Sequence, residues 1–293
     1  MLLHAADLKT TTFMLYIYAL LLLAFGSQKS YASFLSPAIT HKFGRTMKLL
    51  ESDQKVDYGS GTFDNLKGVI FDIDGTLCDS FRLGFEASNS VLSRNDIEQI
   101  SEEHYHECTK YSTPERLARH AGLTPSDPQF EAVGQKLATE FDNLYIGLVT
   151  TETAGFFPGV HDFIDSLHED LAVGALTNAC ARYAYTALEV NLPEKKEKIF
   201  LSVRGADDVP APKPSPDGLR LVCKELGVSP EECVYVGDSP SDAMAAKNAG
   251  MPAIAVLWGS HSEESLRSAP FDHFCNTVEE LRLLLPTKSN IKT

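Results

Sequence analysis

Hydrophobic and polar positions follow two alternating patterns from Asn65 onward. Short apolar runs are separated by longer segments in which apolar residues recur every three or four positions. Runs of about five apolar residues are typical of buried strands, and the longer pattern is typical of amphipathic helices. Strands are expected at Val69–Ile73, Leu171–Leu176, Ile199–Val203, Cys233–Val236 and Ala253–Leu257. Helices are expected at Val160–His168, Ala181–Glu189, Asp217–Leu226 and Asp242–Ala249. This alternation predicts an α/β fold, a Rossmann-like parallel sheet flanked by helices.

The alternation is interrupted between Ser80 and Ala154. This stretch holds only helix-like segments, which are punctuated by Pro114, Gly122 and Pro125. We therefore expect a helical cap domain at residues 82–155. It would be inserted between two parts of one core domain, residues 63–81 and 156–290.

The first 62 residues have a different composition. Phe13–Phe25 is an apolar run that is too short for a bilayer span of about 20 residues, but it matches the core of a signal peptide. Residues 1–33 are therefore expected to be signal-peptide-like. Residues 34–62 are read as a transit peptide or disordered lead-in, because Phe34 to Leu50 carries basic residues and no acidic one. The segment resembles the two-part presequences of algae with secondary plastids, which predicts plastid import. The alternative is translation from Met47 and a cytoplasmic product.

Composition and charge limit the possible partners. The 293 residues carry 26 basic and 40 acidic side chains, a formal charge of −14, with no basic run or stripe. This argues against a nucleic-acid surface, and no membrane partner is expected for the mature form. The cysteines are dispersed without a C-x-x-C pair, so neither a zinc site nor a disulfide scaffold is indicated. They are expected to be small buried side chains. The sequence does not indicate an oligomeric state.

Two aspartates follow the first expected strand. Asp72 and Asp74 lie one residue apart, and no Lys or Arg occurs between Lys67 and Arg82. Carboxylates at the end of a buried strand are costly unless a cation or hydrogen bonds compensate them. Mg²⁺, which prefers hard oxygen ligands, is the natural candidate. The alternative is a simple turn at Asp74-Gly75-Thr76.

Three later segments place further polar residues at strand ends or in a stiff loop. Thr177 and Asn178 follow the second strand, where they could bind a phosphate or cap a helix. Lys213 lies among four prolines that restrict its loop. Asp238 ends another buried strand, whereas Asp242 also fits a capping box. Because the carboxyl ends of parallel strands converge on one crevice, we expect these residues to share one site.

The order of these motifs is similar to that of a known family. D-x-D-G-T, then T-N, then K-P, then G-D-x-x-x-D, spanning residues 69–242, resembles the four motifs of haloacid dehalogenase-like hydrolases. Within that superfamily, the inserted helical cap resembles the subfamily typified by phosphoglycolate phosphatase. A dehalogenase is disfavoured by Asp74, because displacing a halide needs no acid for the leaving group.

The resemblance implies roles for the motif residues. Asp72 would be the nucleophile that forms an aspartyl-phosphate, and Asp74 the general acid and base. Mg²⁺ would be held by the Asp72 carboxylate, the Asp74 backbone carbonyl and Asp238. The phosphoryl group would be bound by Thr177, Asn178, Lys213 and the amides near Gly75. Asp242 would orient Lys213 or a metal-bound water.

The predicted function is therefore Mg²⁺-dependent hydrolysis of a small phosphorylated metabolite, with 2-phosphoglycolate as the expected substrate. Its carboxylate would need a cation in the cap, for which Lys110, Arg116 and Arg119 are candidates. Each could instead be a solvated charge on a helix face. The alternatives are a sugar-phosphate phosphatase, a β-phosphoglucomutase-like enzyme, or a phosphate-binding module without catalysis.

Overall fold

A computed structural model describes residues 66–288 of the chain. These residues belong to one compact unit. The expected signal-peptide-like segment, residues 1–33, and the transit segment, residues 34–62, lie outside the described residues, so plastid import stays a prediction.

The core is a six-stranded parallel sheet in the order β3-β2-β1-β4-β5-β6. The strands are β1 Gly68–Phe71, β2 Ala172–Leu176, β3 Phe200–Arg204, β4 Cys233–Gly237, β5 Ala253–Val256 and β6 His273–Cys275. The predicted α/β fold is confirmed. The strand β6 was not expected, because it has three residues and begins with a histidine, which leaves no apolar run to detect.

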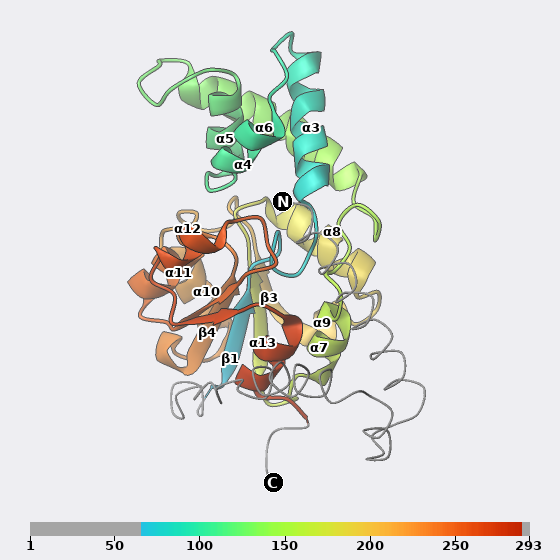
Figure 1. Cartoon of the computed structure of the whole chain (residues 1–293), viewed down its shortest axis with the longest axis vertical. Coiled ribbons are helices and arrows are strands. Elements are labelled where there is room, and N and C mark those ends of the chain that lie inside the picture. Colours follow the sequence, from blue (N-terminus) through green and yellow to red (C-terminus); the bar gives the residue numbers. More distant parts are fainter. Residues whose placement is uncertain (1–65, 289–293) are drawn as a thin grey trace, which may run out of the picture. The chain divides into compact units, whose positions relative to one another are not determined.

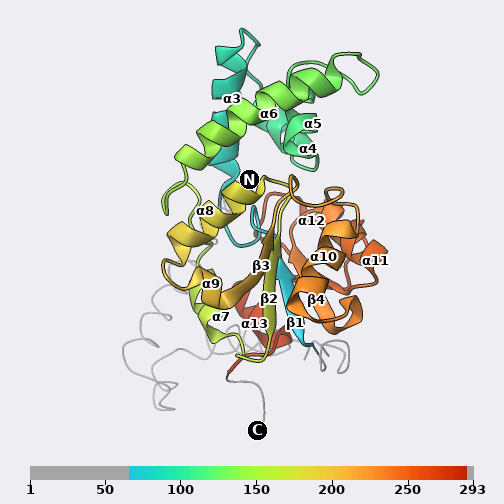
Figure 2. The ribbon, with the colours of Figure 1, turned by 180° about the vertical axis from the view of Figure 1, so that it is seen from behind.

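Helices cover both faces of the sheet (Figures 1 and 2). One face packs against α7 Val160–Ser166, α8 Ala181–Asn191 and α13 Val278–Leu284. The other packs against α10 Asp217–Leu226, α11 Pro240–Ala249 and α12 Glu263–Arg267. Successive residues of β1 point to opposite faces of the sheet. Phe71 packs on the face covered by α7, α8 and α13, and Ile70 packs on the face covered by α10, α11 and α12. This is the alternation expected of a strand buried on both sides.

Two short helices complete the secondary structure of the core domain. The helix α9 spans Lys196–Ile199, and a 3-10 helix spans Pro230–Glu232 before β4.

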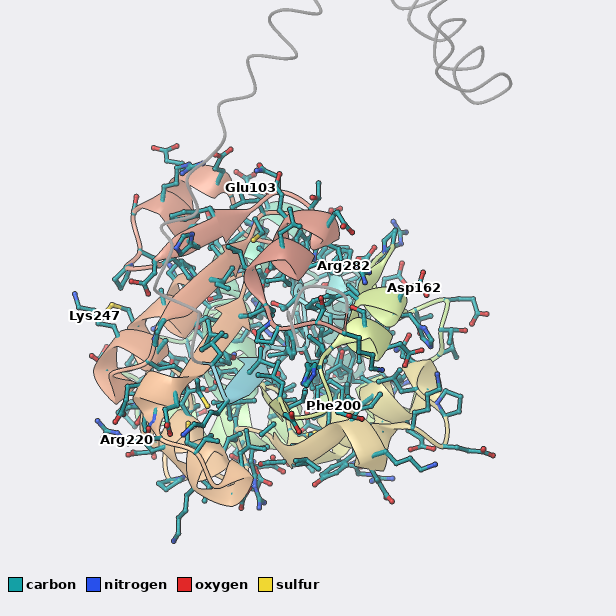
Figure 3. The ribbon with its side chains drawn as sticks, turned by 90° about the horizontal axis from the view of Figure 1, so that it is seen from below. Glu103, Asp162, Phe200, Arg220, Lys247 and Arg282 are labelled. Atoms are coloured by element: carbon teal, nitrogen blue, oxygen red, sulfur yellow. The ribbon has the colours of Figure 1, made fainter. Side chains whose placement is uncertain are left out.

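Charged side chains such as Asp162 and Lys247 project outward at the periphery (Figure 3). All six cysteines are buried and free, as expected. Within residues 66–288, no helix has both the length and the apolar character needed for a membrane span.

Four helices are inserted between β1 and α7: α3 Phe81–Arg94, α4 Glu102–Cys108, α5 Thr113–His120 and α6 Phe130–Gly147. No strand interrupts them in the described residues 81–159. They gather beyond the end of the sheet in both views (Figures 1 and 2). We refer to α3–α6 as the cap helices; the boundaries of the cap domain, residues 82–155, stay a prediction.

Candidate active site

The central position of β1 determines where the site lies. Phe71, the last residue of β1, pairs with Ala175 of β2 and with Val236 of β4. The carboxyl ends of the three strands are therefore level. Asp72, Thr177 and Asp238, which follow these strands, are all buried at the same edge of the sheet.

Lys213 provides the positive charge between two of the acids. Its Nζ lies 3.0 Å from Asp72 Oδ2 and 2.7 Å from Asp242 Oδ1, and it donates to the Tyr235 hydroxyl at 2.8 Å. Burial alone would lower the pKa of Lys213, but Asp242 and Asp72 outweigh it and raise the pKa above its usual value. The lysine is thus a fixed ammonium ion, and Asp242 lies where it can orient it.

Asn178 has a different position from the one expected of a phosphate ligand. Its side-chain amide donates to the Lys213 carbonyl at 3.0 Å, and its side-chain oxygen accepts from the Lys213 amide at 2.9 Å. Asn178 therefore ties the proline-rich loop to the end of β2. Although it lines the pocket, both polar ends of its side chain are already bonded to that loop.

Asp74 has entirely different neighbours from those of Asp72. Its Oδ1 accepts hydrogen bonds from Ser80 Oγ at 2.5 Å, from the Tyr183 hydroxyl at 2.5 Å and from the Tyr145 hydroxyl at 3.2 Å. Thr177 Oγ1 donates to Oδ2 at 3.3 Å. The Tyr145 and Tyr183 rings are stacked with their centroids 4.5 Å apart. Hydroxyl groups from a cap helix and from the core thus orient one carboxyl group.

Asp238 is held by the loop that follows β5. Its Oδ2 accepts from the Ser260 amide at 2.7 Å and from Ser260 Oγ at 3.0 Å, and His261 Nδ1 lies 3.7 Å away. Burial would raise the pKa of Asp238, but His261 and the two Ser260 donors outweigh it and hold that pKa below its usual value. The carboxylate therefore stays ionised.

Asp72, Asp238 and Asp242 form one acidic cluster. One carboxylate oxygen from each lies within 4.8 Å of the other two, and all three residues are buried. Burial raises the pKa of Asp72 well above its usual value, while Lys213 opposes this shift. Three acids face the Lys213 ammonium ion, with His261 beside Asp238, so the acids outnumber the cations around them. Hard oxygen donors with excess negative charge fit a Mg²⁺ ion.

Gly75 contributes through its backbone conformation. Its φ of +72° is in the left-handed region, which favours glycine. A Cβ atom here would lie 2.2 Å from Asp238 Oδ2. The Gly75 amide donates to the Cys78 carbonyl at 3.0 Å, so this amide is not free for a phosphoryl group, contrary to expectation. Gly75 instead allows the D-x-D-G-T turn to approach Asp238.

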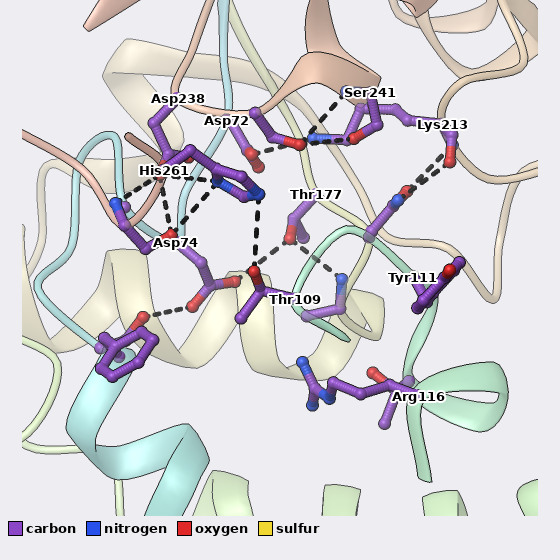
Figure 4. A pocket seen from close by; sticks show the side chains of 18 of the residues that line it. Asp72, Asp74, Thr109, Tyr111, Arg116, Thr177, Lys213, Asp238, Ser241 and His261 are labelled. Atoms are coloured by element: carbon purple, nitrogen blue, oxygen red, sulfur yellow. Dashed lines mark hydrogen bonds and ion pairs between the residues drawn. The ribbon is translucent and has the colours of Figure 1, made fainter. Parts of the chain in front are cut away.

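Both the core and the cap helices line the pocket (Figure 4). The core contributes Asp72, Asp74, Thr177, Lys213 and Asp238, and the cap contributes Tyr105, Thr113, Arg116, Phe141 and Tyr145. Of the three candidate cap cations, Arg116 lines the pocket and Lys110 and Arg119 do not. Arg119 is bonded to Glu115 at 2.7 Å and lies over the Tyr111 ring.

Five polar residues that hold the aspartates were not predicted from the sequence. They are Ser80, Tyr145, Tyr183, Ser260 and His261. They lie outside the four motifs, and a hydroxyl group on an amphipathic helix has no signature that separates it from ordinary packing. Ser80 was the most accessible to prediction, because it precedes α3 by one residue, close to the D-x-D-G-T segment.

Comparisons with known proteins agree with this geometry. A family model described as haloacid dehalogenase-like hydrolase matches residues 69–256. The phosphoglycolate phosphatase of Salmonella paratyphi A is 31% identical over 244 residues, which cover 77% of this chain and 96% of that protein. That of Escherichia coli K12 is 29% identical over 246 residues, 78% of this chain and 96% of the relative.

Two solved structures are also similar. A haloacid dehalogenase-like hydrolase from Bacteroides fragilis superposes with a TM-score of 0.63 at 26% identity, covering 74% of this chain and 99% of that one. CbbY from Rhodobacter sphaeroides, solved as a mutant in complex with xylulose-1,5-bisphosphate, gives a TM-score of 0.60 at 25% identity, with 74% and 96% covered.

Proposed function

Because the chain belongs to the haloacid dehalogenase-like hydrolases, we propose that it hydrolyses a small phosphomonoester through a phosphoryl group carried on Asp72. The observation that supports this most is the contrast between two aspartates one residue apart. Asp72 lies beside a buried ammonium ion, and Asp74 lies among hydroxyl groups. The relatives are named phosphatases, so the chain is an enzyme rather than a passive phosphate-binding module.

In the first step, an oxygen of Asp72 attacks phosphorus. The bond between phosphorus and the ester oxygen breaks, and Asp74 gives a proton to the departing alkoxide. Asp72 Oδ1 accepts from the Ile73 amide at 2.8 Å, which fixes the plane of the nucleophile. Lys213 and Thr177 would bind the phosphoryl oxygens as negative charge develops.

In the second step, water attacks the same phosphorus atom. Asp74 takes a proton from the water, the bond between phosphorus and Asp72 breaks, and inorganic phosphate leaves. Asp74 thus serves as acid and then as base, which requires its carboxyl group to keep one orientation throughout. The hydroxyls of Ser80, Tyr145 and Tyr183 supply that orientation.

Mg²⁺ is the cofactor that the acidic cluster fits. Asp72 and Asp238 would hold it, with the Asp74 carbonyl as a further oxygen donor, while Asp242, which is paired with Lys213, adds negative charge beside it. When bound, the ion would offset the repulsion between an anionic nucleophile and an anionic phosphate. We expect chelation to abolish turnover and added Mg²⁺ to restore it. Full turnover after exhaustive chelation would contradict this part of the proposal.

Phosphoglycolate is the substrate we propose, with Arg116 as the residue that binds its carboxylate. The Arg116 guanidinium lies over the Tyr105 and Phe141 rings, 5.3 and 5.1 Å from their centroids, and it lines the pocket. Its buried Nε has no hydrogen-bond partner among the described residues. A cation with an unused donor at the cap side of the pocket suits a second anionic group on the substrate.

The test compares two esters that differ by the carboxylate. We expect Arg116→Gln to raise KM for 2-phosphoglycolate by about 10–100-fold, the loss of one charged hydrogen-bonded contact. KM for 2-hydroxyethyl phosphate should change little. Arg119→Gln, which alters a cation outside the pocket, is the matched control. An equal effect of Arg116→Gln on both esters would exclude carboxylate recognition.

A sugar phosphate is the second candidate substrate. It is favoured by the similarity to the Rhodobacter sphaeroides protein solved with xylulose-1,5-bisphosphate. A panel of phosphate esters separates the candidates: higher kcat/KM for a sugar phosphate than for 2-phosphoglycolate would select it. A β-phosphoglucomutase-like enzyme would return the phosphoryl group from Asp72 to a sugar instead of releasing inorganic phosphate.

A further inference from the structure

The cap helices contain a second cluster of potential ligands, separate from the pocket. His104 and Cys108 lie one turn apart on α4, and His120 is the last residue of α5. We propose that these three side chains form a metal site for a thiophilic divalent cation, with Zn²⁺ as the expected occupant. None of the three lines the active-site pocket.

The geometry brings the donor atoms together. One ligand atom from each residue lies within 4.8 Å of the other two, and the rings of His104 and His120 have centroids 5.3 Å apart. Tetrahedral zinc with nitrogen and sulfur ligands places its donors roughly 3.3–3.6 Å apart, given bonds of about 2.0–2.3 Å. The donor atoms therefore have to approach one another by no more than about 1.5 Å to bind the metal.

His120 gives independent evidence for a missing ligand. Its side chain is 95% buried, since 5% of its surface is exposed, and both ring nitrogens lack a hydrogen-bond partner among the described residues. A neutral imidazole has one donor and one acceptor, and leaving both unpaired in the interior is costly. Burial, with Arg116 and His104, lowers the pKa of His120 to about 3. The ring is therefore neutral, the form that binds a metal.

The donor set selects the kind of metal. Two imidazoles and a thiol suit zinc or a similar soft cation, whereas the carboxylates of the acidic cluster suit Mg²⁺. Burial raises the pKa of the Cys108 thiol, so the thiol stays protonated until a metal displaces its proton. The resulting thiolate would offset the positive charge of Arg116 and Arg119 nearby. His104 is half-buried, which leaves a route from solvent.

The cluster is joined to the active site through Tyr105. The Tyr105 ring lies 5.9 Å from the His120 ring, centroid to centroid, and the same ring lies under Arg116. Tyr105 and Arg116 both line the pocket. A metal that fastens α4 to α5 would therefore also fix the cap side of the pocket. This consequence rests on the proposed function, whereas metal binding itself does not.

Cobalt titration tests the site directly. The full chain, reduced and freed of metal by a chelator, is titrated with Co²⁺ in the presence of excess Mg²⁺. We expect a near-ultraviolet thiolate-to-cobalt charge-transfer band that saturates at one equivalent and disappears when Zn²⁺ is added. Oxygen ligands in the acidic cluster cannot give this band, so failure here leaves the proposed phosphatase chemistry unaffected. Absence of the band in the unaltered chain would overturn the proposal.

Substitutions test whether the charge-transfer band comes from the cluster of His104, Cys108 and His120. Cys108→Ser should abolish it, and His104→Ala should weaken Co²⁺ binding at least about 10-fold. Cys180→Ser, at a buried cysteine outside the cluster, and Asp238→Asn, in the acidic cluster, should both keep it. His104 is half-buried, so its variant tests the site even if Cys108→Ser fails to fold. A band that survives both Cys108→Ser and His104→Ala, or that disappears in Asp238→Asn, would contradict the assignment.

Discussion

At the scale of single residues, the site places two aspartates, Asp72 and Asp74, in different surroundings. Asp72 contacts an ammonium ion, and Asp74 contacts four hydroxyl groups. A nucleophile has to remain anionic, whereas an acid and base has to exchange a proton in a fixed direction. In the proposed reaction, the Lys213 ammonium ion opposes the rise in the Asp72 pKa that burial causes, and the hydroxyl groups fix the direction of the Asp74 carboxyl group.

Removing one hydroxyl from Asp74 should slow turnover without disturbing the fold. Tyr183→Phe keeps the ring that stacks on Tyr145 and loses the hydrogen bond to Asp74. We expect kcat to fall by about 10–100-fold, because Asp74 is less well oriented, while KM changes little. Tyr185→Phe, at an exposed tyrosine of the same helix, is the control. An unchanged kcat would show that Tyr183 does not position Asp74.

Removing the buried ammonium ion should destabilise the protein. Lys213→Met leaves Asp72 and Asp242 without their shared cation. Breaking a buried ion pair on one side costs about 3–5 kcal/mol. Urea unfolding in the absence of divalent ions measures this cost, with Lys224→Met, at an exposed lysine, as the control. A loss below about 1 kcal/mol would contradict the prediction that Lys213 stabilises the two buried carboxylates.

The sequence identifies the site residues that belong to motifs, but not those that support them. Asp72, Asp74 and Asp238 were predictable because an acid after an apolar run is costly without a partner. Tyr145 and Tyr183 were not, because a tyrosine on an amphipathic helix serves equally well in a core. The use of the Asn178 amide was not predictable either, since it depends on how close the Lys213 backbone approaches.

At the scale of elements, the register of three neighbouring strands brings Asp72, Thr177 and Asp238 to the same level. β1 lies between β2 and β4 with Phe71 opposite Ala175 and Val236, so the residues that follow are level. Apolar runs predicted these strands well. They could not predict β6, whose His273 and Phe274 are half-buried at the edge of the sheet.

The helix α6 carries an acid whose removal should stabilise the fold. Burial, and then Asp207 beyond β3, raise the pKa of Asp142 to about 6. A carboxyl with a raised pKa in the folded state binds an extra proton below that pH, so the fold is penalised as pH rises through about 4–6. Asp142→Asn should therefore add about 1–2 kcal/mol near neutral pH, after a discount for partial exposure.

The stability gained by Asp142→Asn should depend on pH, whereas a gain from better packing would not. The gain of Asp142→Asn should shrink as the pH is lowered from about 7.5 towards 4, because the native carboxyl is then protonated. Urea unfolding at both ends of this range measures it. Asp162→Asn, at an exposed acid of α7, should change stability by less than about 0.5 kcal/mol. A gain that does not depend on pH would contradict the assigned cause.

At the scale of the whole molecule, the inserted cap helices complete the pocket that begins at the edge of the sheet. The sheet edge holds the groups that we propose act on phosphorus, and the cap helices add Arg116, Tyr105 and Tyr145 to the lining of the same pocket. The alternating pattern predicted this division, because a long helical segment between two strands of one sheet has to leave the sheet. The pairing of α4 with α5, which brings His104 and Cys108 to His120, could not be predicted from the sequence.

We propose above all that Asp72 carries the phosphoryl group during turnover. The direct test uses Asp74→Asn with p-nitrophenyl phosphate, whose leaving group needs no acid. Without a base for the second step, the phosphorylated enzyme should accumulate. We expect a burst of about one equivalent of p-nitrophenolate and, by mass spectrometry, a phosphoryl group on the peptide that contains Asp72. The double variant Asp72→Asn/Asp74→Asn should show neither. A burst in the double variant, or a phosphoryl group on another residue, would contradict the account.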